Sequence, residues 1–409
     1  MSEPVAAEVE RQLAAMREGA VDLYGEEALR ERLAVALREG RPLRVKLGMD
    51  PSAPDLHLGH TVVLAKLRRM QELGHTPIFL VGDFTAMIGD PSGRKKTRPA
   101  LTREEIARNA ATYVDQVGRM LDVSRAEVRF NSEWMDAMSS ADMVRLCSHY
   151  TVARLLERDD FAKRYGSGES IAVHEFLYPF VQAYDSVALQ ADVELGGSDQ
   201  TFNLLMAREV QRDYGQPPQA VITHPLLVGT DGRDKMSKSL GNTVGITDAP
   251  EEMYGRSMSI SDLLMLAWIE LLDAGEWGDL SQPRELVAGG EGDPLGLKHD
   301  LARRIVERFH GSDAAEQAAA AFRRVVQGKQ VPEDLPERSF TAGEAGARGL
   351  LELLEALEMV ESRSDARRLI GQSAVSIDGE PERDPTRRLA PGSYLLKVGK
   401  RRFARVRVE

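Results

Sequence analysis

The stretch DPSAPDLHLGH, residues 50–60, separates two segments of different periodicity. Before it, the apolar run at 43–47 predicts a buried strand of a parallel sheet. After it, Val62, Leu64 and Leu67 recur at helical spacing, and the two prolines of the stretch restrict the connection. The sequence therefore predicts a strand, a rigid connection and a helix whose first turn contains His57 and His60.

Two histidines three residues apart lie on one face of a helix. At a helix N-terminus, the unpaired backbone N–H groups and the positive end of the dipole attract anions. Gly59 has no side chain and would let a flat base or a ribose approach the helix closely. Taken alone, the motif fits either a phosphate-transfer site or a pair of surface histidines, and segments further along the chain distinguish the two.

The composition is that of an ordinary globular protein with room for two or three domains. Of the 409 residues, 42% are hydrophobic and 29% are charged. No apolar window reaches the length of a membrane span, and the single Cys147 excludes an internal disulfide. We therefore expect a protein of the reducing cytoplasm with no membrane partner and no metal site made of protein ligands.

The charge is unevenly distributed along the chain. A net charge of −11 argues against a protein that coats nucleic acid with its whole surface. Residues 361–409 nevertheless contain twelve Lys or Arg and seven Asp or Glu, a local net charge of +5. This distribution predicts a nucleic-acid contact confined to the C-terminal end.

The first part of the chain is typical of a parallel α/β sheet. Two amphipathic helices are expected within 5–39, and a second buried strand is expected over 76–83. That strand leads into a loop with Asp90 and a basic run at 94–98. Because ligands bind at the carboxyl ends of parallel strands, Asp90 and the basic run are expected to border the same pocket as the histidines.

Two later segments carry polar side chains suited to a small ligand. Tyr178, Gln182 and Asp185 follow each other at i, i+4 and i+7 and so share one helix face. Residues 191–200 predict a strand that ends in a glycine turn, where Asp199 and Gln200 offer hydrogen-bonding groups. Considered alone, the helix would also fit a packed element with a few satisfied polar residues.

The loop at 229–242 follows another predicted buried strand and is polar and bounded by glycines. Its Lys235 and Lys238 lie three residues apart and can close over a polyphosphate as point charges. A basic loop alone is usually only a solvated surface. Here it completes a set of phosphate-binding features that begins with the two histidines.

Two motifs resemble the signatures of class I aminoacyl-tRNA synthetases: HLGH at 57–60 resembles HIGH, and residues 235–239 read KMSKS. The aligned Tyr178, Gln182 and Asp185, the GGSDQ turn at 196–200 and IGDPSG at 88–93 are similar to bacterial tyrosyl-tRNA synthetases, and this similarity covers nearly the whole chain. The resemblance implies an α/β fold: a Rossmann-like catalytic domain with a parallel sheet, then an α-helical domain and a small α+β RNA-binding domain.

The same resemblance implies a reaction. Tyrosine and ATP would form tyrosyl-adenylate and pyrophosphate, and the tyrosyl group would then pass to the 3′ adenosine of tRNA(Tyr). The substrate carboxylate itself attacks the α-phosphate, so no protein nucleophile is needed, and positioning and charge stabilisation supply the rate.

For ATP, expected with Mg²⁺, the resemblance implies that His57 and His60 hold the phosphates in the transition state. Lys235 and Lys238 would neutralise the departing pyrophosphate. Further residues expected at the nucleotide, besides Lys238, are Asp50, Gly59, Gly197, Asp199, Gln200 and Met236.

For the amino acid, the resemblance assigns Asp90, Tyr178 and Gln182 to the α-ammonium group and Asp185 to the phenol hydroxyl. A buried carboxylate that awaits this hydroxyl is left unpaired by phenylalanine. Such a site rejects the analogue by about 10⁴–10⁵, so no editing domain is required. The full set expected at tyrosine is Lys46, Thr85, Asp90, Tyr178, Gln182 and Asp185.

Lys46 departs from the family pattern. Many members carry a tyrosine four residues before the aspartate at position 50, where it shares the phenol contact, whereas a subgroup of bacterial enzymes tolerates lysine. Three arrangements are open for Lys46: its ammonium group donates to the phenol oxygen, pairs with Asp83, or points away.

The resemblance also implies the domain order. The catalytic domain with its N-terminal helices is expected over 1–248, and a helical domain over 249–330, where the family recognises the anticodon. A helical domain with only a packing role would fit the same pattern. Residues 331–348, rich in Pro, Glu and Gly, predict a linker.

Residues 349–409 are expected to form two short helices, at 350–358 and 363–371, followed by strands joined by an Asp-Gly turn. The first part resembles the αL RNA-binding module first known from a ribosomal small-subunit protein. Arg363, Arg367 and Arg368 share a helical face there and are expected to meet RNA phosphates. The family further implies a homodimer in which one tRNA spans both subunits.

Two other functions stay open at this point. Small nucleotidyltransferases also place a His-x-x-His motif at a helix start with ATP, but they lack the KMSKS loop and an RNA module. A class I ligase for another aromatic amino acid, with the tryptophanyl enzymes as nearest relatives, differs at the phenol end, where Asp185 favours tyrosine. A non-enzymatic RNA-binding descendant is disfavoured because both histidines and both lysines are present.

Overall fold

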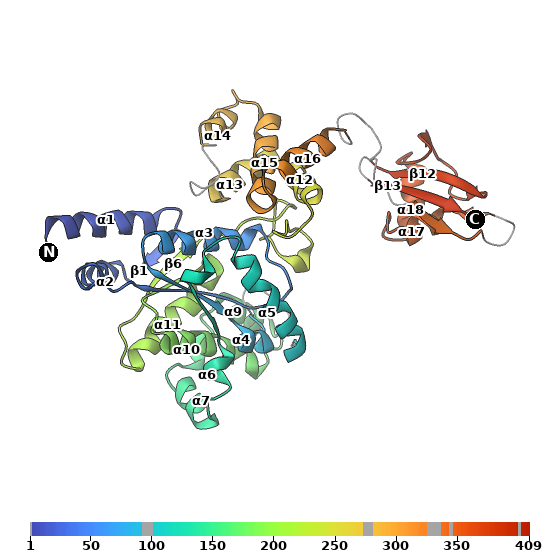
Figure 1. The fold of residues 1–409 in the computed structure, drawn as a ribbon. Helices are drawn as coiled ribbons and strands as arrows, with labels where there is room; N and C mark the ends of the chain where they lie inside the picture. Colours follow the sequence, from blue (N-terminus) through green and yellow to red (C-terminus); the bar gives the residue numbers. More distant parts are fainter. Residues whose placement is uncertain (1, 92–100, 273–280, 325–336, 343–346, 400–401) are drawn as a thin grey trace. The chain divides into compact units, whose positions relative to one another are not determined.

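The computed structural model describes residues 2–91, 101–272, 281–324, 337–342, 347–399 and 402–409 (Figure 1). The chain forms two compact units, Met1–Phe309 and His310–Glu409, and each is treated by itself below. The basic run expected at 94–98 lies outside the described residues.

The first unit is built on a six-stranded sheet with the order β1-β6-β5-β2-β3-β4. All neighbouring strands are parallel except β1, which pairs antiparallel with β6. The chain starts the parallel part at β2 and adds strands first on one side and later on the other. The order therefore reverses between β2 and β5, which is the point where doubly wound sheets bind ligands. The strands are β1 Asp22–Tyr24, β2 Arg44–Met49, β3 Thr76–Val81, β4 Glu127–Phe130, β5 Val193–Gly197 and β6 Ala220–His224.

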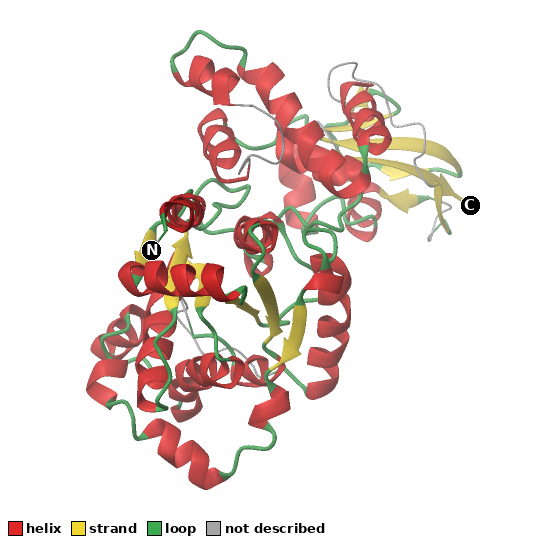
Figure 2. Ribbon diagram, turned by 60° about the vertical axis from the view of Figure 1, so that its left-hand side comes forward, coloured by secondary structure: helices red, strands yellow, loops and turns green. Residues whose placement is uncertain are grey.

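Helices cover both faces of this sheet (Figure 2), with α3 on one face and α10 and α11 on the other (Figure 1). Alternate strand residues fill the core below α3, among them Val45, Phe79 and Leu195. The helices of this unit are α1 Glu3–Arg17, α2 Glu26–Glu39, α3 Leu58–Glu72, α4 Asp83–Ile88, α5 Arg103–Val117, α6 Ser132–Met135, α7 Ser140–Cys147, α8 Val152–Leu155, α9 Asp159–Ser167, α10 Tyr178–Leu189, α11 Thr201–Asp213, α12 Pro250–Met258, α13 Asp262–Leu272, α14 Ser281–Ala288 and α15 Pro294–His310.

The predicted Rossmann-like α/β architecture is confirmed, but part of the N-terminal prediction is wrong. Residues 5–39 contain a strand, Asp22–Tyr24, between the two helices. This segment is too short and too mixed to show a strand pattern by itself. It is extended because β6 offers an edge, where Leu23 pairs with Ile222.

The division into compact units differs from the predicted boundary at 248. Helices α12–α15 belong to the first unit, because α13 packs against α3 and the buried Trp268 indole donates to the Val228 carbonyl at 2.9 Å. Helix α13 begins at Asp262, where Ser261 Oγ accepts from the Leu264 N–H at 3.2 Å. Anticodon recognition by 249–330 stays a prediction.

The second unit contains α16 Ser312–Phe322 and a small α+β module. Two helices, α17 Leu350–Ala356 and α18 Arg363–Gly371, pack on a five-stranded sheet of order β10-β9-β12-β13-β7. Asp378 and Gly379 both have positive φ, 51° and 90°, as the predicted Asp-Gly turn requires. The strands are β7 Glu337–Phe340, β8 Arg348–Gly349, β9 Val375–Ile377, β10 Glu380–Pro381, β11 Arg388–Leu389, β12 Gly392–Val398 and β13 Arg402–Val408.

The prediction that 331–348 is only a linker is wrong for the part of it that the structure describes. Glu337–Phe340 forms β7 and pairs parallel with β13, with Phe340 beside Val408. The polar sequence gave no sign of this strand, because its order comes from the free edge of β13. Separately, none of the described helices is long and apolar enough to cross a membrane.

Candidate active site

A cavity of about 620 Å³ opens at the carboxyl ends of β2 and β5, where the strand order reverses. It is lined by every residue that the sequence predicted for catalysis, ATP or tyrosine. These residues come from the strands β2 and β5, from the helices α3, α4 and α10, and from the connecting segments. They are Lys46, Asp50, His57, Gly59, His60, Thr85, Asp90, Tyr178, Gln182, Asp185, Gly197, Asp199, Gln200, Lys235, Met236 and Lys238.

His57 and His60 stand at the start of α3 as predicted and brace each other. His57 Nδ1 accepts from the Gly59 N–H at 3.2 Å, and His60 Nδ1 accepts from the His57 N–H at 3.1 Å. A Cβ on Gly59 would lie 3.0 Å from the His57 ring, so glycine permits this cap. With both Nδ1 atoms used as acceptors, each neutral ring carries its proton on Nε2 and is a donor to a ligand.

Burial keeps both imidazoles neutral. Burial is the main cause that lowers the pKa of His57 to about 2, and the neighbouring His60 and Lys238 add to it. Burial and Lys238 lower the pKa of His60 to about 4. The ring centroids are 3.9 Å apart, a distance at which two charged rings would repel each other.

The KMSKS loop brings two lysines to the same cavity. In this structure Lys235 Nζ lies 2.5 Å from Asp199 and Lys238 Nζ lies 2.5 Å from Asp55. Both lysines are partly exposed, with 42% and 30% of the side chain accessible, so these ion pairs are weak and can exchange for an anionic ligand.

The buried side chain of Asn242 braces this loop. Its Oδ1 accepts from the Ser237 N–H at 2.8 Å, and its Nδ2 donates to Asp231 Oδ2 at 2.6 Å and to the Lys235 carbonyl at 3.3 Å. One amide group thus connects both ends of the loop to the segment that contains the two lysines.

A second group of side chains surrounds Asp90 and Asp50. Asp90 accepts from Gln200 Nε2 at 3.0 Å and lies 3.5 Å from the buried guanidinium of Arg158. The Tyr178 hydroxyl donates to Asp50 Oδ2 at 3.0 Å. Burial, followed by the charges of Asp50 and Asp90, raises the pKa of Tyr178 well above 10, so this hydroxyl stays a donor.

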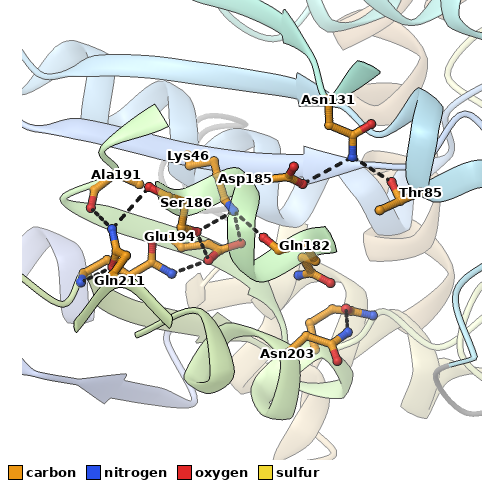
Figure 3. Close-up of polar contacts among 12 residues, drawn as sticks. Lys46, Thr85, Asn131, Gln182, Asp185, Ser186, Ala191, Glu194, Asn203 and Gln211 are labelled. Carbon is orange, nitrogen blue, oxygen red and sulfur yellow. Dashed lines mark hydrogen bonds and ion pairs between the residues drawn. The ribbon is translucent and has the colours of Figure 1, made fainter. Parts of the chain in front are cut away.

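Asp185 lies at the inner end of the cavity on α10. Its Oδ1 accepts from the Trp134 indole at 2.8 Å, and its Oδ2 accepts from Asn131 Nδ2 at 3.3 Å. Asn131 also donates to Thr85 Oγ1 (Figure 3). The Thr85 hydroxyl in turn donates to Asp50 Oδ1 at 2.7 Å. A continuous chain of hydrogen bonds therefore joins the two aspartates at opposite parts of the cavity.

The environment of Asp185 favours its neutral form more than an exposed site would. Burial is the main cause that raises the pKa of Asp185 to about 7. The positive charge of Lys46 and the hydrogen bonds from Trp134 and Asn131 oppose this rise, while Glu194 adds to it. The carboxyl group is therefore poised to change charge near neutral pH.

Of the three arrangements left open for Lys46, the pairing with Asp83 is not the one that the structure shows. Lys46 Nζ lies 2.8 Å from Glu194 Oε1 and donates to Ser186 Oγ at 2.7 Å and to the Gln182 carbonyl at 3.4 Å. All three ammonium donors are thus used by protein acceptors. Asp83 instead accepts from the N–H and the hydroxyl of Ser132.

The sequence interpretation missed several members of the site. Glu194 carried a usable signal, since it is a lone charge between Val193 and Leu195 in a predicted buried strand, as Lys46 is between Val45 and Leu47. Two opposite charges buried in two strands indicate an ion pair. The other missed residues had no comparable signal: Asp55, Asn131, Trp134, Arg158 and Asn242.

The three arginines predicted to bind RNA lie on α18 in the second unit. Arg363 pairs with Glu355 at 2.7 Å and Arg368 with Asp365 at 2.6 Å. Arg367 is exposed on the same helix. Within the described ranges, no three His, Cys, Asp or Glu side chains are arranged to hold a metal ion.

The comparisons with known proteins agree on one family. Residues 38–327 match the family model described as tRNA synthetases class I (W and Y). A tyrosine–tRNA ligase of Bordetella parapertussis is 51% identical over 405 residues, which are 99% of this chain and 98% of that protein. A tyrosine–tRNA ligase of Oleidesulfovibrio alaskensis is 52% identical over 399 residues, which are 98% of this chain and 99% of that protein.

Solved structures show the same fold. A tyrosyl-tRNA synthetase of Archaeoglobus fulgidus, solved in complex with L-tyrosine, superposes with a TM-score of 0.61 at 25% identity and covers 76% of this chain and 99% of its own. A tyrosyl-tRNA synthetase of Aeropyrum pernix has a TM-score of 0.61 at 21% identity and covers 77% of this chain and 98% of its own.

Proposed function

This chain belongs to the W and Y family of class I tRNA synthetases and has the activity of a tyrosine–tRNA ligase, and we propose that the cavity residues divide this reaction among them as follows. Tyrosine and ATP react to tyrosyl-adenylate and pyrophosphate. The tyrosyl group is then transferred to the 3′ adenosine of tRNA(Tyr).

The observation that carries this proposal is the chemical contrast between the two ends of one cavity. One end has neutral imidazole donors and two partly exposed lysine charges, which suit a polyphosphate. The other end has a buried carboxyl group, Asp185, held by donors from Trp134 and Asn131. Such a group suits a phenol hydroxyl, which is a donor.

At the amino-acid end, Asp185 accepts the phenol hydroxyl of tyrosine. Gln182 Oε1 is buried and has no hydrogen-bond partner in the described part of the chain, which supports its role as an acceptor for the α-ammonium group. Asp90 and the Tyr178 hydroxyl complete that subsite. Phenylalanine has no hydroxyl group and would leave Asp185 without a hydrogen-bond donor, so it is rejected.

At the nucleotide end, an oxygen of the tyrosine carboxylate bonds to the α-phosphorus while the bond to the β-phosphate oxygen breaks and pyrophosphate leaves. The Nε2–H groups of His57 and His60 donate to the phosphate oxygens as negative charge builds up. Lys235 and Lys238 leave Asp199 and Asp55 and neutralise pyrophosphate. Mg²⁺ is also part of this proposal. It would be bound to the ATP phosphates and would reduce their charge.

The nucleoside part of ATP rests on small and flat surfaces of the cavity. A Cβ on Gly197 would lie 2.7 Å from Asp199 and from Leu226, which supports a glycine that leaves space for the nucleotide. Asp50, Gly59, Gln200 and the buried Met236 complete the set that we assign to ATP.

For tRNA, we assign Arg363, Arg367 and Arg368 on α18 to phosphate contacts, and helices of 249–330 to anticodon recognition. The local net charge of +5 over 361–409 supports an RNA contact in this module. We also propose a cytoplasmic location, which the single cysteine and the action on tRNA(Tyr) support.

A homodimer is also part of the proposal. Within residues 144–173, four large apolar side chains are 62–80% exposed, namely Val144, Val152, Tyr165 and Val173. Large exposed apolar side chains favour association with a second copy. The molecular mass in solution tests the homodimer. The variant Val173→Asp is expected to shift the equilibrium from dimer toward monomer.

The test of the activity is pyrophosphate exchange with ATP, run in parallel with tyrosine, phenylalanine and tryptophan, followed by aminoacylation of tRNA. Exchange with tyrosine alone and charging of tRNA(Tyr) are expected. Preferential exchange with another amino acid would make the chain a ligase for that amino acid, and exchange without tRNA charging would reduce it to a nucleotidyltransferase.

A further inference from the structure

Lys46 and Glu194 face each other at the point where the strand order of the sheet reverses. They are direct neighbours in register across the parallel pair β2–β5, and their charged atoms are 2.8 Å apart. Neither is accessible, since the side chains are 1% and 2% exposed. The ion pair therefore lies inside the protein, at the inner end of the cavity, which both residues help to line.

The pair also connects the sheet to α10 (Figure 3). Lys46 donates to Ser186 Oγ and to the Gln182 carbonyl, and Ser186 Oγ in turn donates to Glu194 Oε2 at 3.1 Å. Glu194 further accepts from Gln219 Nε2. The contacts of Lys46 on α10 thus lie on either side of Asp185 in the sequence.

The pair acts on Asp185 through charge as well. Lys46 is the strongest influence that lowers the pKa of Asp185, whereas Glu194 raises it. Since all three groups are buried, a change in one of them is felt by the other two. Without Lys46, two carboxyl groups would share the inner end of the cavity with no positive charge beside them.

Stability alone does not account for this ion pair. Removing two charges from water costs so much free energy that apolar side chains of similar size are often equally stable at such positions. The specific directions of the Lys46 donors, toward two groups that flank Asp185, suggest a role in placing α10.

We propose that Lys46 and Glu194 are positioning residues that hold α10 so that Asp185 and Gln182 receive tyrosine in the correct place, and that neither residue touches the substrate. This inference rests on the proposed assignment of Asp185 and Gln182 to tyrosine. Under this inference, Lys46 contributes to the selection of tyrosine over phenylalanine without touching the phenol group. In other family members, a tyrosine residue at this position makes that contact directly.

The experiment compares Lys46→Met, Glu194→Gln and the double variant with the wild type. For each, we measure KM for tyrosine and for ATP in pyrophosphate exchange, the ratio of kcat/KM for tyrosine over phenylalanine, tyrosine binding by calorimetry, and Tm. Lys46→Met is expected to raise the tyrosine KM about tenfold or more and to lower the discrimination ratio by a similar factor. The ATP KM is expected to stay within about twofold.

The double variant separates positioning from stability. Each single variant leaves one buried charge without its partner and is expected to lower Tm, whereas the double variant removes both charges and is expected to regain most of the Tm. Its tyrosine KM and discrimination are expected to stay impaired, because the Lys46 donors to α10 are still missing. A double variant with wild-type Tm, tyrosine affinity and discrimination would overturn the inference.

A matched control is Lys298→Met. Lys298 is also a buried lysine and donates to the Ile260 carbonyl at 2.7 Å and to Asp262 at 2.6 Å, away from the cavity. It is expected to lower Tm and leave the tyrosine KM unchanged, so an equal rise of this KM would also overturn the inference. If the wild type itself shows no tyrosine-dependent exchange and no tyrosine binding, the proposed function fails first, and that result is distinct from the others. If Lys46→Met does not fold, the double variant and Glu194→Gln carry the test.

Discussion

The indole Nε1 of Trp134 donates a 2.8 Å hydrogen bond to Asp185 Oδ1. It is one of two hydrogen bonds that favour the charged form of a carboxyl group whose pKa burial raises to about 7. The half-buried Trp134 therefore connects the short helix α6 to the charge of the proposed phenol acceptor.

Trp134→Phe removes this donor and is expected to raise the pKa of Asp185 above 7 by about one unit. If the carboxylate form accepts the hydrogen bond from the phenol hydroxyl, kcat/KM for tyrosine rises with pH through that pKa. In the variant, kcat/KM then reaches its plateau at higher pH. The measurement is kcat/KM for tyrosine between about pH 5.5 and 8.5. Trp268→Phe, which removes an indole donor far from Asp185, is the control, and equal profiles for the two variants would contradict the assignment.

Asp185→Asn is expected to make the protein more stable at pH 8 and nearly inactive with tyrosine. The pKa of the Asp185 carboxyl group is about 7 in the native state, against an ordinary value of 3.8. Between these two pH values the native state therefore keeps a proton that the unfolded chain has lost. Stability from this group is present below pH 4 and is lost as pH rises toward 7. The cost above pH 7 is a few kcal/mol, since one pKa unit corresponds to about 1.4 kcal/mol. Denaturant unfolding at pH 5 and 8 checks this, and a destabilised variant at pH 8 would refute it.

Acid is expected to destabilise the whole first unit through four buried neutral histidines. The pKa is lowered, mainly by burial, to about 2 for His57 and to about 4 for His60, His75 and His224. The unfolded chain binds these protons first, so the free energy of unfolding falls as pH drops from about 6.5 toward 4. The carboxyl groups of Asp185 and Asp160, whose pKa burial raises, act in the opposite direction and are outweighed by the four histidines.

This acid effect can be tested with His75→Asn, which keeps an acceptor for the Leu43 N–H but does not titrate. The fall in unfolding free energy between pH 6.5 and 4 is expected to be shallower in the variant by about 1 to 3 kcal/mol. An unchanged slope would show that His75 is not buried as a neutral ring.

Asn242→Ala is expected to lower the rate of adenylate formation about tenfold or more, because the KMSKS loop loses three hydrogen bonds and leaves the Ser237 N–H without its acceptor. Single-turnover kinetics with saturating tyrosine measures this rate, and tyrosine affinity is expected to stay the same. Arg233→Ala, an exposed change in the same loop, serves as control. Equal rates for the wild type and Asn242→Ala would refute a bracing role.

Arg367→Glu is expected to raise KM for tRNA about tenfold and to leave tyrosine-dependent pyrophosphate exchange unchanged, because the change lies in the module that we assign to RNA binding. The salt dependence of tRNA binding is expected to become shallower by about one unit of slope for the lost phosphate contact. Arg38→Glu places the same charge change on the exposed end of α2 and is the control. If both variants change tRNA binding equally, only net charge matters.

Much of the site followed from local sequence patterns. Apolar runs predicted the strands, prolines and glycines predicted the connections, and helical spacing placed His57 with His60 and Tyr178 with Asp185. Because the strands are parallel, polar residues that follow them must meet at one edge of the sheet. For this reason Asp90 could be predicted to border the same pocket as His57 and His60, and the family resemblance added the other residues of the cavity.

The tertiary structure alone decided which of these residues are partners. Lys46 could be matched with Asp83 by sequence, but its partner is Glu194, because β2 lies next to β5 and register places the two side chains opposite each other. Asp22–Tyr24 and Glu337–Phe340 are strands because β6 and β13 have free edges beside them. Propensity and periodicity act over a few residues, whereas these choices depend on strand neighbours that are far apart in the chain.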